Sequence, residues 1–124
     1  MKPKIAVVED NPDNRLLVQA ILDEEYEILE FESGVAAVEG LLGNIPDLIL
    51  LDISLPEMDG TEVLAWIREQ GELRSTPVVA LTAHAMAGDR EKFLAAGFDD
   101  YLTKPIIDET LLTGTIARWL KEGR

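Results

Sequence analysis

Residues 48–60, LILLDISLPEMDG, join an apolar run to a loop that contains proline and glycine. Asp52 follows four aliphatic residues directly, where a carboxylate is costly to bury unless a positive charge meets it. The runs IAVV at 5–8 and VVAL at 78–81 are apolar in the same continuous way. Strands without polar alternation are covered on both faces, so these runs predict the centre of a parallel sheet.

The rest of the chain alternates between strand-like and helix-like segments. Asn11 and Ser33 are expected to cap helices, Pro12 suits a first helical turn, and Gly97 suits a helix end. Five strand–helix repeats predict an α/β sandwich with a parallel sheet, formed as a single domain over residues 1–124. We expect strands at 4–9, 27–31, 47–52, 77–82 and 100–103, and helices at 12–24, 34–42, 61–69, 88–96 and 108–121.

The composition narrows the function classes. A chain of 124 residues with 47% hydrophobic and 28% charged residues suits one folded domain. The absence of cysteine excludes disulfides, thiol catalysis and cysteine-ligated metals. A net charge of −13 argues against direct nucleic-acid binding, which needs clustered lysine and arginine. The sequence shows neither a secretory signal nor a run of ~18 uncharged apolar residues, so we expect a cytoplasmic protein without membrane contact.

Polar side chains gather where the predicted strands end. Glu9 and Asp10 follow the first strand, Asp52 ends the third, Thr82 ends the fourth, and Lys104 follows the fifth. One acid at a strand end is most simply a helix cap. In an open parallel sheet, however, the carboxyl ends of the strands border the crevice where ligands bind. The coincidence therefore favours a functional site.

These residue types indicate phosphoryl chemistry. Carboxylates without histidine or cysteine ligands suit Mg²⁺, which also accepts phosphate oxygens. A carboxylate can attack phosphorus and form an aspartyl-phosphate. Phosphoryl transfer depends on positioning and on neutralising the phosphoryl oxygens, which Mg²⁺, Lys104 and the Thr82 hydroxyl can do.

At these positions the sequence resembles the CheY-like receiver domains of two-component response regulators. The resemblance rests on four motifs in order: VVEDNPDNR at 7–15, LLDISLPEMDG at 50–60, LTAHAM at 81–86 and GFDDYLTKP at 97–105. It implies a flavodoxin-like sheet of order 2-1-3-4-5 with helices on both faces.

The resemblance implies a role for each acidic position. Asp52 matches the phosphoacceptor, which also contributes to the metal site. Asp10 matches a direct Mg²⁺ ligand, and the main-chain carbonyl of Ser54 is expected to be a further ligand. Glu9 matches a position that is often aspartate, so we expect its longer side chain to act through a metal-bound water.

The resemblance also implies a phosphoryl-binding switch. Thr82, with Ala83 after it, and Lys104 match residues that contact the phosphoryl group. Pro105 is expected to follow Lys104 through a cis peptide that aims the lysine inward. Tyr101 is expected to turn inward once Thr82 moves toward the phosphoryl group. That movement would remodel the face made by the fourth helix, fifth strand and fifth helix.

Ser54 and His84 lie at positions that tune phosphate lifetime in the family. For His84, an exposed loop histidine without a role is the alternative.

The function implied is a phosphoacceptor receiver that takes its phosphoryl group from a sensor histidine kinase or phosphotransfer protein. Such a protein catalyses only its own phosphorylation and dephosphorylation, and is expected as a monomer or a weak phosphorylation-dependent dimer.

Two alternative functions remain. One is a Mg²⁺-dependent phosphohydrolase, although Ser54 stands where such enzymes carry an acid/base aspartate; the other is an interaction module that has lost phosphorylation. The initiating methionine leads us to expect a stand-alone receiver, the alternative being a piece of a hybrid kinase or larger regulator.

Overall fold

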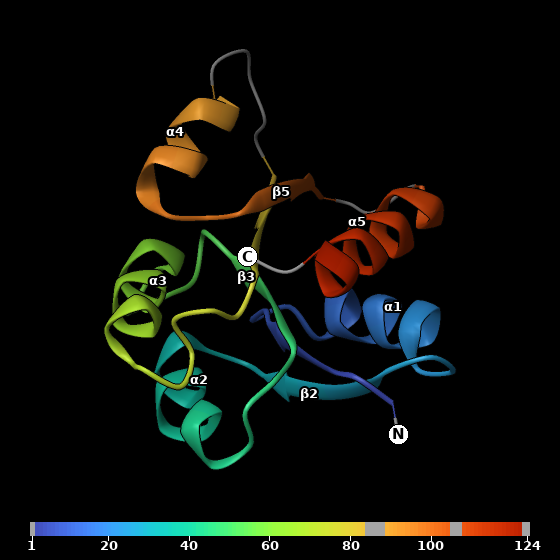
Figure 1. The fold of residues 1–124 in the computed structure, drawn as a ribbon, viewed down its shortest axis with the longest axis horizontal. Helices are drawn as coiled ribbons and strands as arrows, with labels where there is room; N and C mark the ends of the chain where they lie inside the picture. The colour runs from blue at the N-terminus through green and yellow to red at the C-terminus, as the bar shows by residue number, and fades with distance from the viewer. Residues whose placement is uncertain (1, 84–88, 105–107, 123–124) are drawn as a thin grey trace.

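The computed structural model describes residues 2–83, 89–104 and 108–122, and its elements alternate as strand and helix along the chain (Figure 1). The strands are β1 (Lys4–Val8), β2 (Glu27–Phe31), β3 (Leu48–Asp52), β4 (Val78–Thr82) and β5 (Asp100–Thr103). The helices are α1 (Pro12–Leu22), α2 (Gly34–Gly40), the 3₁₀ turn η1 (Leu41–Gly43), α3 (Gly60–Glu69), α4 (Asp89–Ala96) and α5 (Glu109–Glu122).

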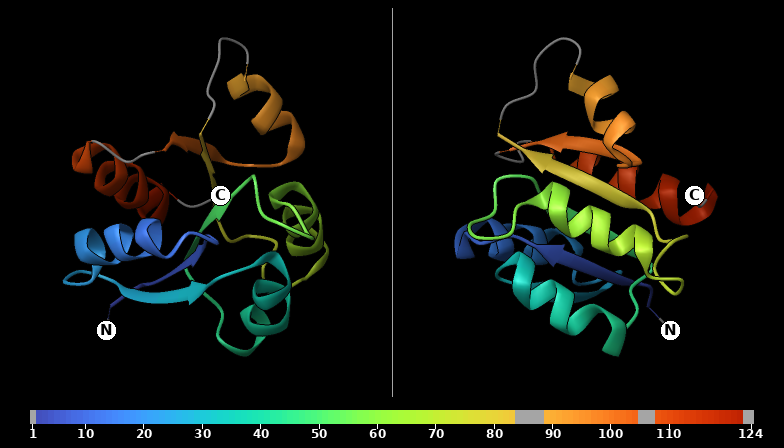
Figure 2. Two further views of the ribbon diagram at one scale, coloured as in Figure 1. Left: turned by 180° about the vertical axis from the view of Figure 1, so that it is seen from behind. Right: turned by 90° about the vertical axis from the view of Figure 1, so that its left-hand side faces the viewer.

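The five strands form one parallel sheet in the order β2-β1-β3-β4-β5, as the resemblance implied. Helices α1 and α5 cover one face, and α2, α3 and α4 cover the other (Figures 1 and 2). Because the strands are parallel, their carboxyl ends meet at one edge of the sheet. The polar residues that follow the predicted strands are expected at that edge.

Alternate residues of the central strands serve two separate cores. Ile5 and Leu50 pack with α1 and α5, in a cluster that contains Leu22 and Ile116. Neighbouring residues on the same strands turn toward α2, α3 and α4, where the second cluster includes Ile67. Every residue of β3 and β4 is buried, which confirms the prediction from their continuous apolar runs.

The predicted helix boundaries hold where a capping side chain or a special backbone angle sets them. Asn11 accepts hydrogen bonds from the N–H groups of Asp13 (2.8 Å) and Asn14 (3.3 Å), so α1 begins there. Ser33 caps α2 in the same way. Gly97 has φ of +112°, a left-handed angle that ends α4.

Other boundaries were wrong by one or two residues. The helix expected at 12–24 ends at Leu22, because three acids in succession (residues 23–25) follow it and negative charge disfavours a helix C-terminus. The first strand was expected to end at Glu9, but it ends one residue earlier, at Val8. The 3₁₀ turn at Leu41–Gly43 was not predicted.

Within the described ranges, no helix combines the length and the apolar character needed to cross a bilayer.

Candidate functional site

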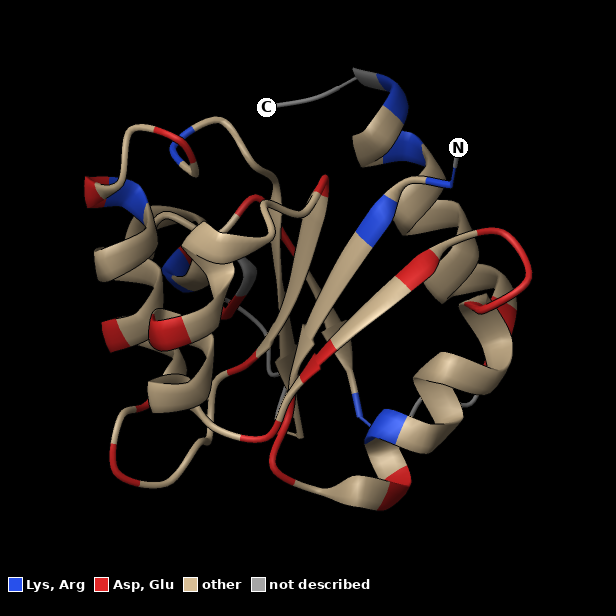
Figure 3. Cartoon of the chain, turned by 90° about the horizontal axis from the view of Figure 1, so that it is seen from below, with Lys and Arg blue, Asp and Glu red and all other residues tan. Residues whose placement is uncertain are grey.

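The polar residues predicted to meet at the sheet edge do meet there. Glu9, Asp52 and Thr82 are buried, and Asp10 is exposed beside them. Several acidic segments lie where the strands end, away from the N-terminus (Figure 3). The site therefore has a buried floor and an open acidic side.

Lys104 joins the two buried acids. Its Nζ lies 3.0 Å from Glu9 Oε1 and 3.0 Å from Asp52 Oδ2. The Lys104 main-chain N–H donates to the carbonyl of Thr82 at 2.7 Å, which extends the pairing of β4 with β5 by one step. The lysine is thus aimed by backbone structure, and it answers the cost of burying Asp52.

The loop after β3 holds Asp52 closely. The Ser54 N–H donates to Asp52 Oδ1 at 3.0 Å, so each carboxylate oxygen has a donor. The Gly60 N–H donates to the Ile53 carbonyl at 2.9 Å. A Cβ on Gly60 would lie 2.4 Å from the Asp52 carbonyl oxygen, so only glycine allows α3 to start this close to β3.

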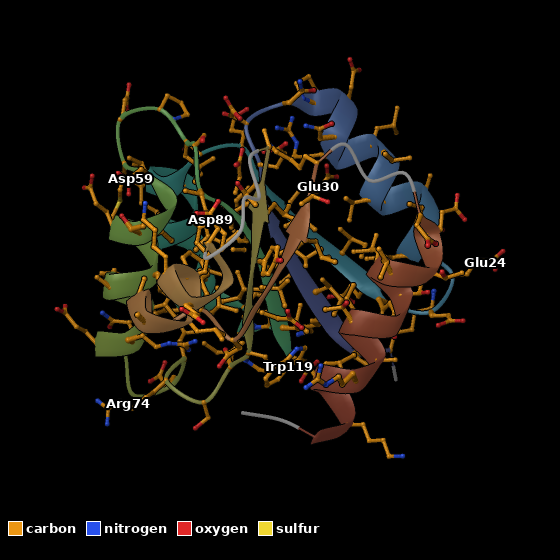
Figure 4. The ribbon with its side chains drawn as sticks, turned by 90° about the horizontal axis from the view of Figure 1, so that it is seen from above. Glu24, Glu30, Asp59, Arg74, Asp89 and Trp119 are labelled. Atoms are coloured by element: carbon orange, nitrogen blue, oxygen red, sulfur yellow. The ribbon has the colours of Figure 1, made fainter. Side chains whose placement is uncertain are left out.

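Glu9 is fixed from both neighbouring elements. Its N–H donates to the Phe31 carbonyl at 3.0 Å, and Arg15 Nη1 donates to its carbonyl at 2.7 Å. Asn14 Nδ2 donates to Glu9 Oε1 at 2.5 Å. The Arg15 guanidinium also forms an ion pair with Glu30 at 3.4 Å. Figure 4 shows Glu30 at the same end of the domain as Asp59, which lies in the loop after β3. Asn14 and Arg15 were not predicted as site residues. Their position in the first turn of α1, directly after Glu9 and Asp10, could have indicated that they lie near the site.

Burial and the pairing of the acids separate their pKa values. Burial, and then the hydrogen bond with Asp52, raises the pKa of Glu9 to about 7. Burial acts against ionisation of Asp52 too, but hydrogen bonds with Glu9, Lys104 and the Ser54 N–H hold the pKa of Asp52 below its usual value. The pKa of Lys104 is raised, because the two carboxylates outweigh the effect of its burial. Asp52 is therefore the charged carboxylate near neutral pH, whereas Glu9 is only partly ionised there.

The acids also form a candidate metal site. Glu9, Asp10 and Asp52 each offer a carboxylate oxygen, and these atoms lie within 4.8 Å of one another. A set of hard oxygen donors fits Mg²⁺ and does not favour softer metals.

The residues predicted as the switch lie on neighbouring strands. Thr82 is buried at the end of β4, and Ala83 is exposed after it. Tyr101 is half-buried on β5, and its ring packs against Phe93 of α4 with centroids 5.6 Å apart. The ring thus contacts the helix whose surface it is expected to change.

Two expected site residues, His84 and Pro105, lie outside the described residues. Ser54 is exposed at the rim, where its side chain faces solvent.

Comparison with known proteins agrees with this geometry. The family model of the response regulator receiver domain matches residues 5–116. The sensor protein GacS of Pseudomonas syringae pv. syringae is 43% identical over 122 residues, which are 94% of this chain and 13% of GacS. This chain thus spans about an eighth of such sensor kinases. The polar-differentiation response regulator DivK of Brucella ovis is 41% identical over 107 residues, which are 86% of this chain and 87% of DivK.

A solved structure is similarly close. The receiver domain of the sensor histidine kinase PA1611 of Pseudomonas aeruginosa PAO1 is 38% identical and superposes with a TM-score of 0.87. The match covers 98% of this chain and 99% of that domain, which has a magnesium ion coordinated in its active-site cleft.

Proposed function

This chain belongs to the response regulator receiver domain family of two-component signalling, and we propose that Asp52 is its phosphoacceptor. The observation that carries the proposal is the position of Asp52. Its carboxylate is buried at the end of β3, stays ionised, and lies 3.0 Å from the Lys104 ammonium. An ionised carboxylate next to a fixed cation suits attack on an anionic phosphoryl group.

The proposed reaction is transfer from a phosphohistidine of a sensor histidine kinase or phosphotransfer protein. An Asp52 oxygen forms a bond to phosphorus, the phosphorus–nitrogen bond of the donor breaks, and its electron pair stays on the imidazole. Lys104 then moves its hydrogen bond from Asp52 to a phosphoryl oxygen. The same site catalyses the slow return by hydrolysis, and no external substrate is turned over.

We propose that the site uses Mg²⁺, as the PA1611 receiver does. Asp10, Asp52 and the Ser54 carbonyl would hold the ion, and Glu9 would act through a metal-bound water. When bound, Mg²⁺ supplies positive charge to the phosphoryl oxygens.

The output follows from the residues beside the acceptor. The Thr82 hydroxyl moves toward the phosphoryl group, and Tyr101 leaves its contact with Phe93 to fill the space. Because Phe93 belongs to α4, this changes the α4–β5–α5 face that partners bind. Location in the cytoplasm and a monomer or weak phosphorylation-dependent dimer complete the proposal.

A beryllofluoride titration tests this function. Backbone amide NMR spectra of the protein with Mg²⁺ should change around the site and on α4 and β5 when beryllofluoride is added. Asp52→Asn should abolish the change, whereas Asp23→Asn, at the exposed end of α1, should keep it. Unchanged spectra for the unsubstituted protein would overturn the proposal.

A further inference from the structure

Both the main chain and the carboxylate of Glu9 are held by hydrogen bonds. Its main chain is bonded on both sides, by the Phe31 carbonyl and the Arg15 guanidinium. Its Oε1 accepts from Asn14 at 2.5 Å and from Lys104 at 3.0 Å. A glutamate side chain has several rotamers, and these contacts favour the one that meets Asn14 and Lys104.

Asn14 reaches Glu9 because the start of α1 is fixed. The Asn11 side chain caps the helix and accepts from the Asn14 N–H at 3.3 Å. The amide of Asn14 is thereby directed back over the end of β1. It faces the carboxylate next to Asp10 and Asp52 without itself belonging to the acidic cluster.

The α1 side chains beside Asn14 cannot replace its hydrogen bond to Glu9. A cavity of about 10 Å³ lies between α1 and the sheet, close to the smallest space that holds one water. Glu9, Asn14 and Lys104 line it together with aliphatic Leu17 and Val18. The other α1 side chains at this cavity therefore offer no hydrogen bond.

We propose that Asn14 is a positioning residue for cation binding at this site: it holds the Glu9 carboxylate in the arrangement that receives Mg²⁺. The inference rests on the proposed function. A longer acid at position 9 needs a partner that sets where its oxygens lie, and Asn14 is that partner. Partners of direct metal ligands typically contribute about 10- to 100-fold to metal affinity, and because Glu9 acts through a metal-bound water, we expect the contribution of Asn14 at the lower end of that range.

The test is isothermal calorimetry with Mg²⁺ in two backgrounds. Asn14→Leu, which keeps the branched shape and removes the donor, should weaken Mg²⁺ binding by about 10-fold. In a Glu9→Asp background the shorter acid does not reach Asn14, so the same substitution should change affinity by less than about twofold. Asn14→Ala serves as a second variant, and Gln19→Leu, on the same helix, should leave affinity unchanged.

Thermal unfolding without Mg²⁺ separates positioning from simple stabilisation. A lower melting temperature with an unchanged Mg²⁺ affinity would overturn the inference, as would an equal loss of affinity in both backgrounds. Failure of the unsubstituted protein to bind Mg²⁺ would overturn the proposed function as well. Wild-type binding that Asn14→Leu and Asn14→Ala leave intact would overturn this inference alone.

Discussion

Replacing Lys104 by methionine tests the electrostatics of the site. Methionine keeps most of the side-chain volume but removes the ammonium that lies 3.0 Å from both Glu9 and Asp52. Those side chains are 1% and 2% exposed, so water can replace little of the stabilisation that the lysine provides. Removing one partner of a buried ion pair typically costs 3–5 kcal/mol, and about 3 kcal/mol is expected here because Glu9 can hold a proton. For a chain of 124 residues this lowers Tm by about 10 °C.

The stability lost in Lys104→Met should increase as pH rises. The folded pKa of Glu9 is already about 7, against 4.5 for an unperturbed glutamate, and loss of Lys104 raises it further. Between those two values the folded state binds more protons than the unfolded state, so stability falls as pH rises. The variant extends that window above pH 7. The difference in free energy of unfolding between wild type and Lys104→Met should be smallest near pH 5, where Glu9 shares a proton with Asp52. It should be largest near pH 8.

The assay is thermal and urea unfolding, followed by circular dichroism, at several pH values without Mg²⁺. Lys92→Met, at an exposed position of α4, is the control and should change stability by less than about 0.5 kcal/mol. Equal stability of Lys104→Met and wild type at pH 8, or a deficit that grows as pH falls, would refute the electrostatic account.

Three further predictions concern Gly60, Glu9 and Asp59. Gly60→Ala should lower the free energy of unfolding by about 1–3 kcal/mol, because its Cβ would lie 2.4 Å from the Asp52 carbonyl oxygen. Gly43→Ala meets nothing within 4 Å, so a similar loss there in urea unfolding would contradict this explanation. Since the pKa of Glu9 is raised to about 7, Mg²⁺ should bind more tightly at about pH 8 than at about pH 6 and should release a proton; calorimetric heats that do not depend on the buffer would argue against it. Asp59→Ala should cost about 1 kcal/mol at neutral pH through loss of the α3 cap. The pKa of Asp59 is lowered by the Thr61 hydroxyl and the Glu62 N–H, so that cost should vanish as pH falls through the folded pKa, and acid titration of both proteins' stability measures this.

Sequence sufficed for the fold wherever a local signal decides the structure. Continuous apolar runs identify β3 and β4 because both faces of these strands are covered. Caps such as Asn11 set helix starts through contacts two or three residues away. The end of α1 and the 3₁₀ turn at Leu41–Gly43 depend on several weak interactions of similar size. The predicted boundaries were wrong at both places.

The candidate site could be predicted only as far as topology reaches. Parallel strands bring Glu9, Asp52 and Lys104 to one edge, and the structure confirms that they meet. The contact of Asn14 with Glu9 depends on the angle at which α1 leaves the sheet, which no residue spacing specifies. The close approach of Gly60 to β3 likewise appears only once the helix is packed, although the glycine itself is visible in the sequence.

The central claim is that Asp52 accepts a phosphoryl group, and intact-mass spectrometry after incubation with Mg²⁺ and a small phosphodonor tests it most directly. The protein should gain the mass of one phosphoryl group, and Asp52→Asn should gain none. Removal of Mg²⁺ by a chelator should also prevent the gain. A phosphoryl group on Asp52→Asn, or no modification of the wild-type protein with any donor, would contradict the account.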